Sequence, residues 1–141
     1  MKMEDYTLVE RPPSVEEYQR LRDSTDWDPL DDEVVEKGLQ NTLFSVCAVI
    51  HDEVIGCGRI IGDGSMYFYI QDVIVLPQFQ GRGIGTHIMS ALLDYLKTHA
   101  KNNSFIGLMA AKGTSGFYER HGFERRPPDA PGMFLIWRHD G

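Results

Sequence analysis

The sequence predicts an α/β (α+β) fold in which helices pack on a mixed central sheet. The first observation is the order of the periodic segments, which reads helix, helix, three strands, helix, strand, helix and two strands. The second is the composition: 42% of the 141 residues are hydrophobic and 11% are aromatic, which suits a packed core and argues against disorder. The length fits a single domain over residues 1–141, and no repeat or linker divides it.

Two helices are predicted in the N-terminal part of the chain. Ser14 is followed three residues later by Glu17, the capping-box pattern that marks a helix start, and apolar residues then recur at helical spacing. Asp31 is the candidate N-cap of a second, shorter helix that ends near Leu39. The acid-rich stretch between the two helices contains Trp27, and we expect it to be a loop.

The middle of the chain predicts three strands followed by a helix. The strand segments are rich in β-branched and aromatic residues, are separated by turns, and cover residues 44–50, 54–61 and 66–76. Pro77 ends the third strand, and a glycine cluster then leads into an amphipathic helix. The apolar face of that helix carries Ile84, Ile88, Ala91, Leu92, Tyr95 and Leu96.

The last third of the chain predicts a strand, a small helix and two more strands. A short apolar run at 105–110 is typical of a buried strand, and the helix over 115–120 ends at Gly122, a residue that favours helix termination. The final strands are expected near 123–126 and 133–138, on either side of a turn rich in proline.

Charge and hydropathy exclude several classes of protein. The formal net charge is −7, which speaks against a nucleic-acid partner because phosphates need a basic face. The longest apolar stretch, 66–76, is far shorter than the ~20 residues of a membrane span. The N-terminus lacks the pattern of an export signal, and the two cysteines, Cys47 and Cys57, are too few for a disulfide framework. We therefore expect a cytoplasmic protein with no membrane partner.

A glycine-rich loop, residues 80–86, lies between the third strand and the amphipathic helix. Backbone N–H groups without helical partners converge there at the positive end of the helix dipole, and Arg82 adds a charge. A phosphate or diphosphate is therefore the expected ligand. The loop lacks the Gly-Lys-Ser/Thr of a mononucleotide P-loop and the G-x-G-x-x-G spacing of a dinucleotide site. A glycine-rich turn without a ligand is the alternative interpretation.

Two further patterns occur together and in order. Val75-x-Pro77 is followed by Gln80-x-x-Gly83-x-Gly85, and Phe117-Tyr118-Glu119-x-x-Gly122-Phe123 follows about thirty residues later. Together they resemble the diphosphate motif and the second motif of the GNAT superfamily of acetyl-CoA-dependent N-acetyltransferases, over residues 44–138. The resemblance implies the GNAT acyltransferase fold, a mixed central sheet whose parallel strands at 66–76 and 105–110 splay apart, with about four flanking helices. The segments 70–77 and 131–134 are also similar to the plastid and cyanobacterial serotonin N-acetyltransferase branch.

The resemblance implies acetyl-CoA as the cosubstrate. Ala111 departs from the family pattern, because many members carry an asparagine there, so contacts in that region are expected from backbone groups and from Lys112 or Ser115. The pantetheine arm would lie beside the long strand and the diphosphate in the glycine loop. The full set of expected cofactor-binding residues is Ile74, Val75, Gln80, Gly81, Arg82, Gly83, Ile84, Gly85, Thr86, Lys112, Ser115 and Tyr118.

The resemblance also implies direct attack of an amine on the thioester. Tyr118 is the expected proton donor to the departing thiolate, with a core tyrosine as the alternative. An amide N–H near Val75 is the candidate donor to the thioester carbonyl. Asp72, the one carboxylate on the long strand, is the candidate base if a bulge turns it toward the cleft. Equally, Asp72 could be a buried carboxylate that ties down a helix end or an arginine such as Arg59. A third option is a water relay through backbone carbonyls, with no dedicated base.

The acceptor pocket in such folds lies between the first helices and the final strands. Its expected residues are Trp27, Tyr69, Gln71, Met133 and Phe134. The acids near Trp27 would attract a small primary amine, although a run of acids is also typical of a solvated face. The main hypothesis is a small-molecule amine acetyltransferase; the alternatives are a non-catalytic acyl-CoA-binding module and a protein or peptide N-acetyltransferase. We expect no metal, since no residue spacing suggests one, and the resemblance is compatible with a homodimer.

Overall fold

The computed structural model describes residues 5–139, which form two compact units, the first ending at Leu108 and the second beginning at Met109. The strands all belong to the first unit: β1 (Thr7–Val9), β2 (Phe44–Ile50), β3 (Glu53–Gly62), β4 (Tyr67–Val75) and β5 (Phe105–Gly107). The same unit contains α1 (Val15–Asp23), α2 (Asp32–Gln40), the 3-10 turn η1 (Pro77–Phe79) and α3 (Ile84–His99). The second unit contains α4 (Ser115–Glu119).

The five strands form one mixed sheet in the order β1-β2-β3-β4-β5. The neighbours from β1 to β4 are antiparallel, and β4 pairs with β5 in parallel. Over residues 5–139, the predicted α/β (α+β) fold, with a mixed central sheet, a parallel pair in the expected place and four α-helices, is therefore confirmed.

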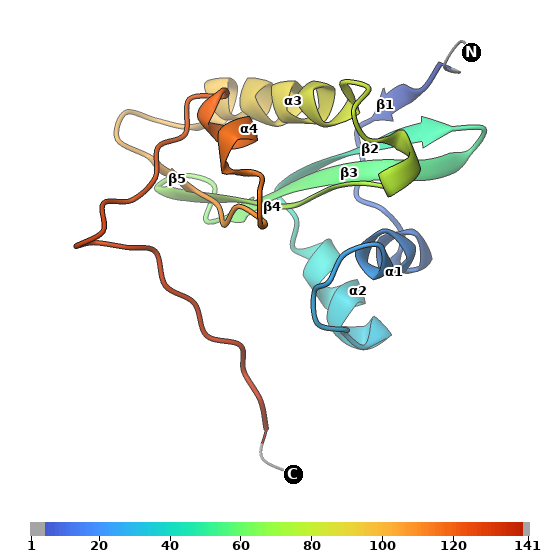
Figure 1. Cartoon of the computed structure of the whole chain (residues 1–141), viewed down its shortest axis with the longest axis horizontal. Coiled ribbons are helices and arrows are strands. Elements are labelled where there is room, and N and C mark those ends of the chain that lie inside the picture. The colour runs from blue at the N-terminus through green and yellow to red at the C-terminus, as the bar shows by residue number, and fades with distance from the viewer. Residues whose placement is uncertain (1–4, 140–141) are drawn as a thin grey trace. The chain divides into compact units, whose positions relative to one another are not determined.

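Helices cover both faces of this sheet. Figure 1 shows α3 along one face and α1 and α2 across the other. A Cβ atom at Gly58 of β3 would come within 2.6 Å of Ile88 Cγ2 in α3, so the glycine lets this helix lie close to the sheet. The next residue, Arg59, points to the opposite face, where its Nη2 donates to Gly38 O of α2 at 2.9 Å. Adjacent residues of β3 thus contact helices on opposite faces of the sheet, Gly58 with α3 and Arg59 with α2.

The core is formed where α1 and α3 meet the sheet. Leu21 of α1, Ile55 of β3 and Phe68 of β4 are almost completely buried. In α3 the buried residues are Ile84, Ile88, Met89, Leu92 and Leu96. The expected face of this helix is therefore correct in its main residues, although Ala91 and Tyr95 are only half-buried and Met89 packs inside instead.

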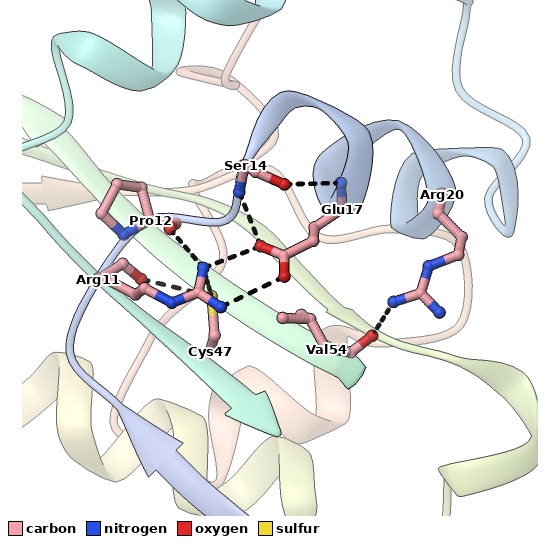
Figure 2. Close-up of polar contacts among 7 residues, drawn as sticks. All are labelled: Arg11, Pro12, Ser14, Glu17, Arg20, Cys47 and Val54. Carbon is pink, nitrogen blue, oxygen red and sulfur yellow. Dashed lines mark hydrogen bonds and ion pairs between the residues drawn. The ribbon is translucent and has the colours of Figure 1, made fainter. Parts of the chain in front are cut away.

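The N-terminus of α1 is fixed by the predicted capping box. Figure 2 shows the Glu17 amide donating to Ser14 Oγ at 3.1 Å and the Ser14 amide donating to Glu17 Oε1 at 2.8 Å. Both nitrogens at the end of the Arg11 guanidinium donate to the same carboxylate, at 2.8 and 3.3 Å. These hydrogen bonds from Arg11 outweigh burial and lower the pKa of Glu17. One carboxylate therefore joins the preceding loop to the helix start.

We expect the substitution Ser14→Ala to lower the free energy of unfolding by about 1 kcal/mol, because the Glu17 amide loses its acceptor. Urea denaturation followed by circular dichroism measures the change. Ser90→Ala is the matched control, since Ser90 is an exposed serine within α3 and its loss should change stability by less than about 0.5 kcal/mol. Equal losses in the two variants would contradict a capping role for Ser14.

The ends of the sheet differ from the expectation. The short edge strand β1 was not predicted, and β5 covers Phe105–Gly107 rather than 105–110. The strands expected at 123–126 and 133–138 are wrong, because both segments lie outside every helix and strand of the described residues. Met133 to Trp137 are 50–83% exposed. Alternating or apolar residues indicate a strand only if a neighbouring strand completes the ladder, and the ladders of the described sheet include neither segment.

Candidate functional site

The glycine-rich loop has an open backbone at the start of α3. Gly81 and Gly83 have φ values of +78° and +85°, the left-handed region that glycine adopts without strain. Gly83 is the N-cap of α3, and a Cβ atom at either glycine would meet nothing within 4 Å. The first intrahelical hydrogen bond of α3 is the one from the His87 amide to Gly83 O, at 3.0 Å. The amides before it have no such acceptor and can face an anion.

Side chains around the loop connect it to β4. The Gln80 side chain donates to Val75 O at 2.9 Å, which fastens the end of the strand to the start of the loop. The guanidinium carbon of Arg82 lies 5.7 Å from the centre of the Phe79 ring. Arg82 directly precedes Gly83, so a positive charge belongs to the same loop as the open amides, and both favour an anionic ligand.

The parallel strands separate before β4 ends. Their ladder runs through Tyr67↔Phe105, Phe68↔Ile106 and Tyr69↔Gly107, whereas β4 continues to Val75. Beyond Tyr69, alternate backbone N–H and C=O groups of β4 therefore point toward the β5 side of the strand but have no ladder partner in β5. This part of β4 contains Ile74 and Val75, the residues expected beside the pantetheine arm; Ile74 is buried and Val75 is half-buried.

A β-bulge interrupts β4 at Asp72. The register pairs Arg59 with Gln71 and Cys57 with Ile74, so β4 carries one more residue than β3 between these pairs. Asp72 has a φ of +57°, which is unusual for a residue other than glycine. The Cys57 thiol donates to Asp72 O at 3.2 Å. The bulge considered from the sequence is therefore present, and it turns the Asp72 side chain to the face of the sheet where α1 and α2 lie.

The carboxylate of Asp72 is fully engaged. Its Oδ2 accepts from Arg59 Nη1 at 2.7 Å, and its Oδ1 accepts from the Tyr18 hydroxyl at 2.9 Å. The side chains of Asp72 and Arg59 are only 1% and 10% exposed. Burial and the neighbouring carboxylate raise the pKa of Tyr18, so the phenol stays protonated as a donor. The contact with an arginine, one of the two alternatives left open by the sequence, is therefore formed.

Arg22 continues this group of contacts to the loop between α1 and α2. Its Nη1 donates to the Tyr18 hydroxyl at 2.8 Å and its Nε donates to Asp28 O at 2.9 Å. The guanidinium carbon also lies 5.4 Å from the Trp27 ring centre. Of the expected acceptor residues, Trp27, Tyr69 and Gln71 are half-buried in this first unit. Sequence patterns do not identify Tyr18 or Arg22 as site residues, because their i, i+4 spacing on α1 indicates a shared helix face but not what that face contacts.

The remaining expected site residues belong to the second unit. Tyr118 lies in α4, half-buried, with its ring edge-on to Phe117 at 5.1 Å, and burial raises the pKa of its phenol. Ser115 Oγ accepts from Arg125 Nη2 at 2.7 Å, and Lys112 is exposed. Met133 and Phe134, expected in the acceptor pocket, are 83% and 78% exposed. 

Comparison with known proteins decides the family. The profile of the acetyltransferase (GNAT) domain matches residues 41–125, a range that begins before β2 and ends after α4. The chain belongs to the GNAT acetyltransferase family. Among solved structures, this GNAT chain is similar to the Staphylococcus aureus protein SA2161, with a TM-score of 0.89 and 34% identity over 94% of this chain and 100% of that one. It is also similar to the GNAT family acetyltransferase SP0256 of Streptococcus pneumoniae, with a TM-score of 0.80 and 29% identity, covering 96% and 100%.

A curated relative gives the same family. A ycf52-like N-acetyltransferase of Prochlorococcus marinus, whose name describes it as uncharacterized, is 33% identical over 115 residues. The match covers 79% of the GNAT chain described above but only 63% of the relative's length.

The two cysteines of the GNAT chain are buried and unreactive. Burial raises the pKa of Cys47 to about 11, and that of Cys57 is also raised well above its ordinary value, mainly by burial. Both thiols therefore stay neutral at physiological pH, which fits packing rather than nucleophilic catalysis. Between residues 5 and 139, no three His, Cys, Asp or Glu side chains come together as a metal site requires. No helix in the same range is long and apolar enough to cross a membrane.

Proposed function

We propose that this chain, as a single N-acetyltransferase domain over residues 1–141, transfers the acetyl group of acetyl-CoA to a primary amine of a small molecule. The observation that carries the proposal is the loop between β4 and α3, where Gly81 and Gly83 leave the amides of the first helical turn open to an anion. Acetyl-CoA, when bound, supplies the thioester that the amine attacks. The new bond joins the amine nitrogen to the acetyl carbon, and the carbon–sulfur bond breaks.

The residues of the loop and of β4 share the work of binding. Residues 80–86, with the charge of Arg82, would hold the diphosphate. Ile74 and Val75 lie on the stretch of β4 beyond its ladder with β5, so their backbone is the proposed edge for the pantetheine arm. A main-chain N–H between the bulge and Val75 would donate to the thioester carbonyl as negative charge develops on its oxygen. Lys112 and Ser115 remain proposed contacts from the second unit.

The amine must lose a proton before or during the attack. A primary amine with a pKa near 10.4 is less than about 0.1% neutral at pH 7. Asp72 was the candidate base, but both of its oxygens already accept hydrogen bonds and its side chain is 1% exposed. We therefore favour a water relay along backbone carbonyls for proton removal, with Asp72 in a positioning role. In an Asp72→Asn variant, an unshifted acidic limb of the pH–rate profile would support this choice, and a shifted one would restore Asp72 as the base.

Binding of acetyl-CoA tests the proposal directly. At a concentration about 100 times its dissociation constant, the cosubstrate should stabilise the fold by about 2.7 kcal/mol, a rise of roughly 10 °C in Tm. A thermal melt with and without acetyl-CoA measures this. An unchanged melt would remove the basis of the proposal. Binding without consumption of acetyl-CoA across a panel of amines would instead favour the acyl-CoA-binding module.

Tyr118 is the proposed proton donor to the departing thiolate. We expect Tyr118→Phe to lower kcat by about 100-fold or more, the usual contribution of a positioned general acid, while the Kd for acetyl-CoA stays within about twofold. Steady-state kinetics and calorimetry measure the two quantities. Phe117→Leu, at the neighbouring position in α4, controls for a disturbed helix and should lower kcat much less. Normal turnover in Tyr118→Phe would exclude it as the donor.

The acceptor is proposed to be a small cationic amine that binds near Trp27, Tyr69 and Gln71, with Met133 and Phe134 contributing from the C-terminal segment. An acetyl-CoA consumption screen should include arylalkylamines such as serotonin, polyamines, aminoglycosides, amino acids and a lysine peptide. Turnover of the peptide alone would favour a protein or peptide acetyltransferase and overturn the small-molecule assignment.

The protein is further proposed to form a homodimer and to reside in the cytoplasm. Met133 to Trp137 form a run of exposed apolar side chains, which monomers seldom leave in contact with water. Light scattering after size exclusion should therefore give twice the chain mass, and a charged substitution, Leu135→Glu, should return the mass to that of one chain. A wild-type mass of one chain would contradict the dimer. The free cysteines Cys47 and Cys57 support a reducing compartment, which cell fractionation tests.

A further inference from the structure

The carboxylate of Asp72 joins the bulge of β4 to both helices of the N-terminal helix–loop–helix. From α1, the Tyr18 hydroxyl donates to Oδ1 at 2.9 Å. From β3, Arg59 donates to Oδ2 at 2.7 Å and, through Nη2, to Gly38 O of α2 at 2.9 Å. Arg59 Nε also donates to Thr42 Oγ1 at 3.1 Å, just after α2. One buried anion therefore fixes two separate helices to the same point of the strand.

The hydroxyl of Tyr18 has a defined direction in this network. A phenol has one donor and also accepts, and here the donor is used on Asp72 while the oxygen accepts from Arg22 Nη1 at 2.8 Å. Arg22 is half-buried, and a second nitrogen of its guanidinium, Nε, donates to Asp28 O at 2.9 Å. A continuous chain of hydrogen bonds therefore runs from the backbone carbonyl of Asp28, in the α1–α2 loop, through Arg22 and Tyr18 to the bulge.

The loop itself has little freedom to move apart from α1. Arg22 lies against the Trp27 ring at 5.4 Å, and the Trp27 amide donates to Thr25 Oγ1 at 3.1 Å. Farther along, the Gln19 side chain donates to Leu30 O at 2.7 Å. A displacement of α1 would therefore carry the loop with it, and the buried hydrogen bond from Tyr18 to Asp72 fixes α1 to the bulge of β4.

We propose that Tyr18 and Arg22 are positioning residues that couple residues 24–31 to the bulge at Asp72. The inference rests on the proposed function, in which an amine binds near Trp27 and the thioester carbonyl meets an amide of β4 close to the bulge. The two side chains then set the distance between the amine nitrogen and the acetyl carbon, and misplacement of reacting atoms by about 1 Å can lower a rate by about 100-fold. The coupling acts on the acceptor and leaves the diphosphate loop unchanged.

Three variants test the coupling. Tyr18→Phe removes both hydrogen bonds and keeps the ring, while Arg22→Gln breaks the link at a half-buried position where the fold is less at risk. Arg20→Ala is the matched control: this arginine lies on the same helix but donates to Val54 O, in contact with β3 rather than with the bulge (Figure 2). Thermal melts first establish that each variant is folded.

The first measurement needs no amine. Hydrogen exchange of the peptide covering 67–76 should quicken about tenfold in Tyr18→Phe and in Arg22→Gln, the effect of losing one hydrogen bond to a charged group. Trp27 emission, measured in a Trp137→Phe background, should shift in the same two variants. In Arg20→Ala both signals should match the wild type. Unchanged exchange in Arg22→Gln, or an equal change in Arg20→Ala, would overturn the coupling.

The second measurement uses an amine found in the screen. In Tyr18→Phe and Arg22→Gln the KM for the amine should rise, or kcat should fall, by about tenfold, while the KM for acetyl-CoA changes by less than about twofold. The double variant should be no worse than the poorer single one, because both break one connection. Additive losses would mean that the residues act separately. If the wild type acetylates no amine, the proposed function fails, and hydrogen exchange still decides the coupling.

Discussion

Replacement of Gly83 by aspartate is expected to abolish the stabilisation by acetyl-CoA. The carboxylate would stand at the N-cap of α3, next to the amides proposed to hold the diphosphate. Two like charges about 5 Å apart repel by about 3 kcal/mol at an effective dielectric constant of 20, and the diphosphate carries more than one. We expect the Kd measured by calorimetry to rise by more than about 100-fold, since each 1.4 kcal/mol is a factor of ten.

Two control variants separate charge from backbone strain. Gly83→Ala retains the φ of +85° without adding a charge, so the left-handed conformation should cost about 1–2 kcal/mol of stability with only a modest loss of binding. Gly64→Asp places the same carboxylate at a similar φ, +79°, in the turn before β4, where its Cβ meets only Leu43 Cδ2 at 3.9 Å. Binding should survive there. Comparable losses in Gly64→Asp and Gly83→Asp would show that the loop is not the diphosphate site.

The parts of this site that could be predicted from the sequence depend on local structure. A strand ended by Pro77, a cluster of glycines and a helix with an apolar face are all readable within a few residues, and the structure has them in that order. The capping box at Ser14 is of the same kind, because its two hydrogen bonds join residues three apart. The phosphate-binding character of the loop follows from these local features alone.

The network around Asp72 could not be predicted, because it depends on register. The bulge exists only because β4 gains one residue against β3 between Cys57 and Arg59. No residue near Asp72 in the sequence signals a φ of +57°, and Tyr18 is separated from it by 54 positions. The sequence is therefore equally compatible with a base and with an ion pair, because the Arg59 contact depends on the register of β4 against β3 and the Tyr18 contact on the packing of α1.

The error in the C-terminal segment has a different cause. Residues 133–137 are five apolar residues in succession, a pattern that favours a strand. Strand formation also needs a partner edge, which a single-chain pattern does not specify. The same exposed apolar run is the support for the proposed dimer.

Removal of Arg59 is expected to lower the free energy of unfolding more than removal of a charge from an exposed ion pair. In Arg59→Met the carboxylate of Asp72 would stay buried with the Tyr18 hydroxyl but without a positive partner. Breaking a buried ion pair in this way typically costs about 3–5 kcal/mol, a large part of the stability of a small domain. Guanidinium denaturation measures the loss, and Arg59→Met/Asp72→Asn should recover at least about 2 kcal/mol of it because no charge is then left unpaired.

An exposed ion pair on α3 is the control for the loss of stability in Arg59→Met. Lys97 Nζ lies 3.7 Å from Asp94 Oδ1, and the two side chains are 80% and 76% exposed. Lys97→Met should therefore change stability by less than about 1 kcal/mol, since water already solvates both groups. If Arg59→Met costs no more than Lys97→Met, then the ion pair is not what holds Asp72 in place, and the positioning role proposed for it loses this support. A large difference instead means that the buried ion pair belongs to the framework that holds the bulge in place, which supports the positioning role proposed for Asp72.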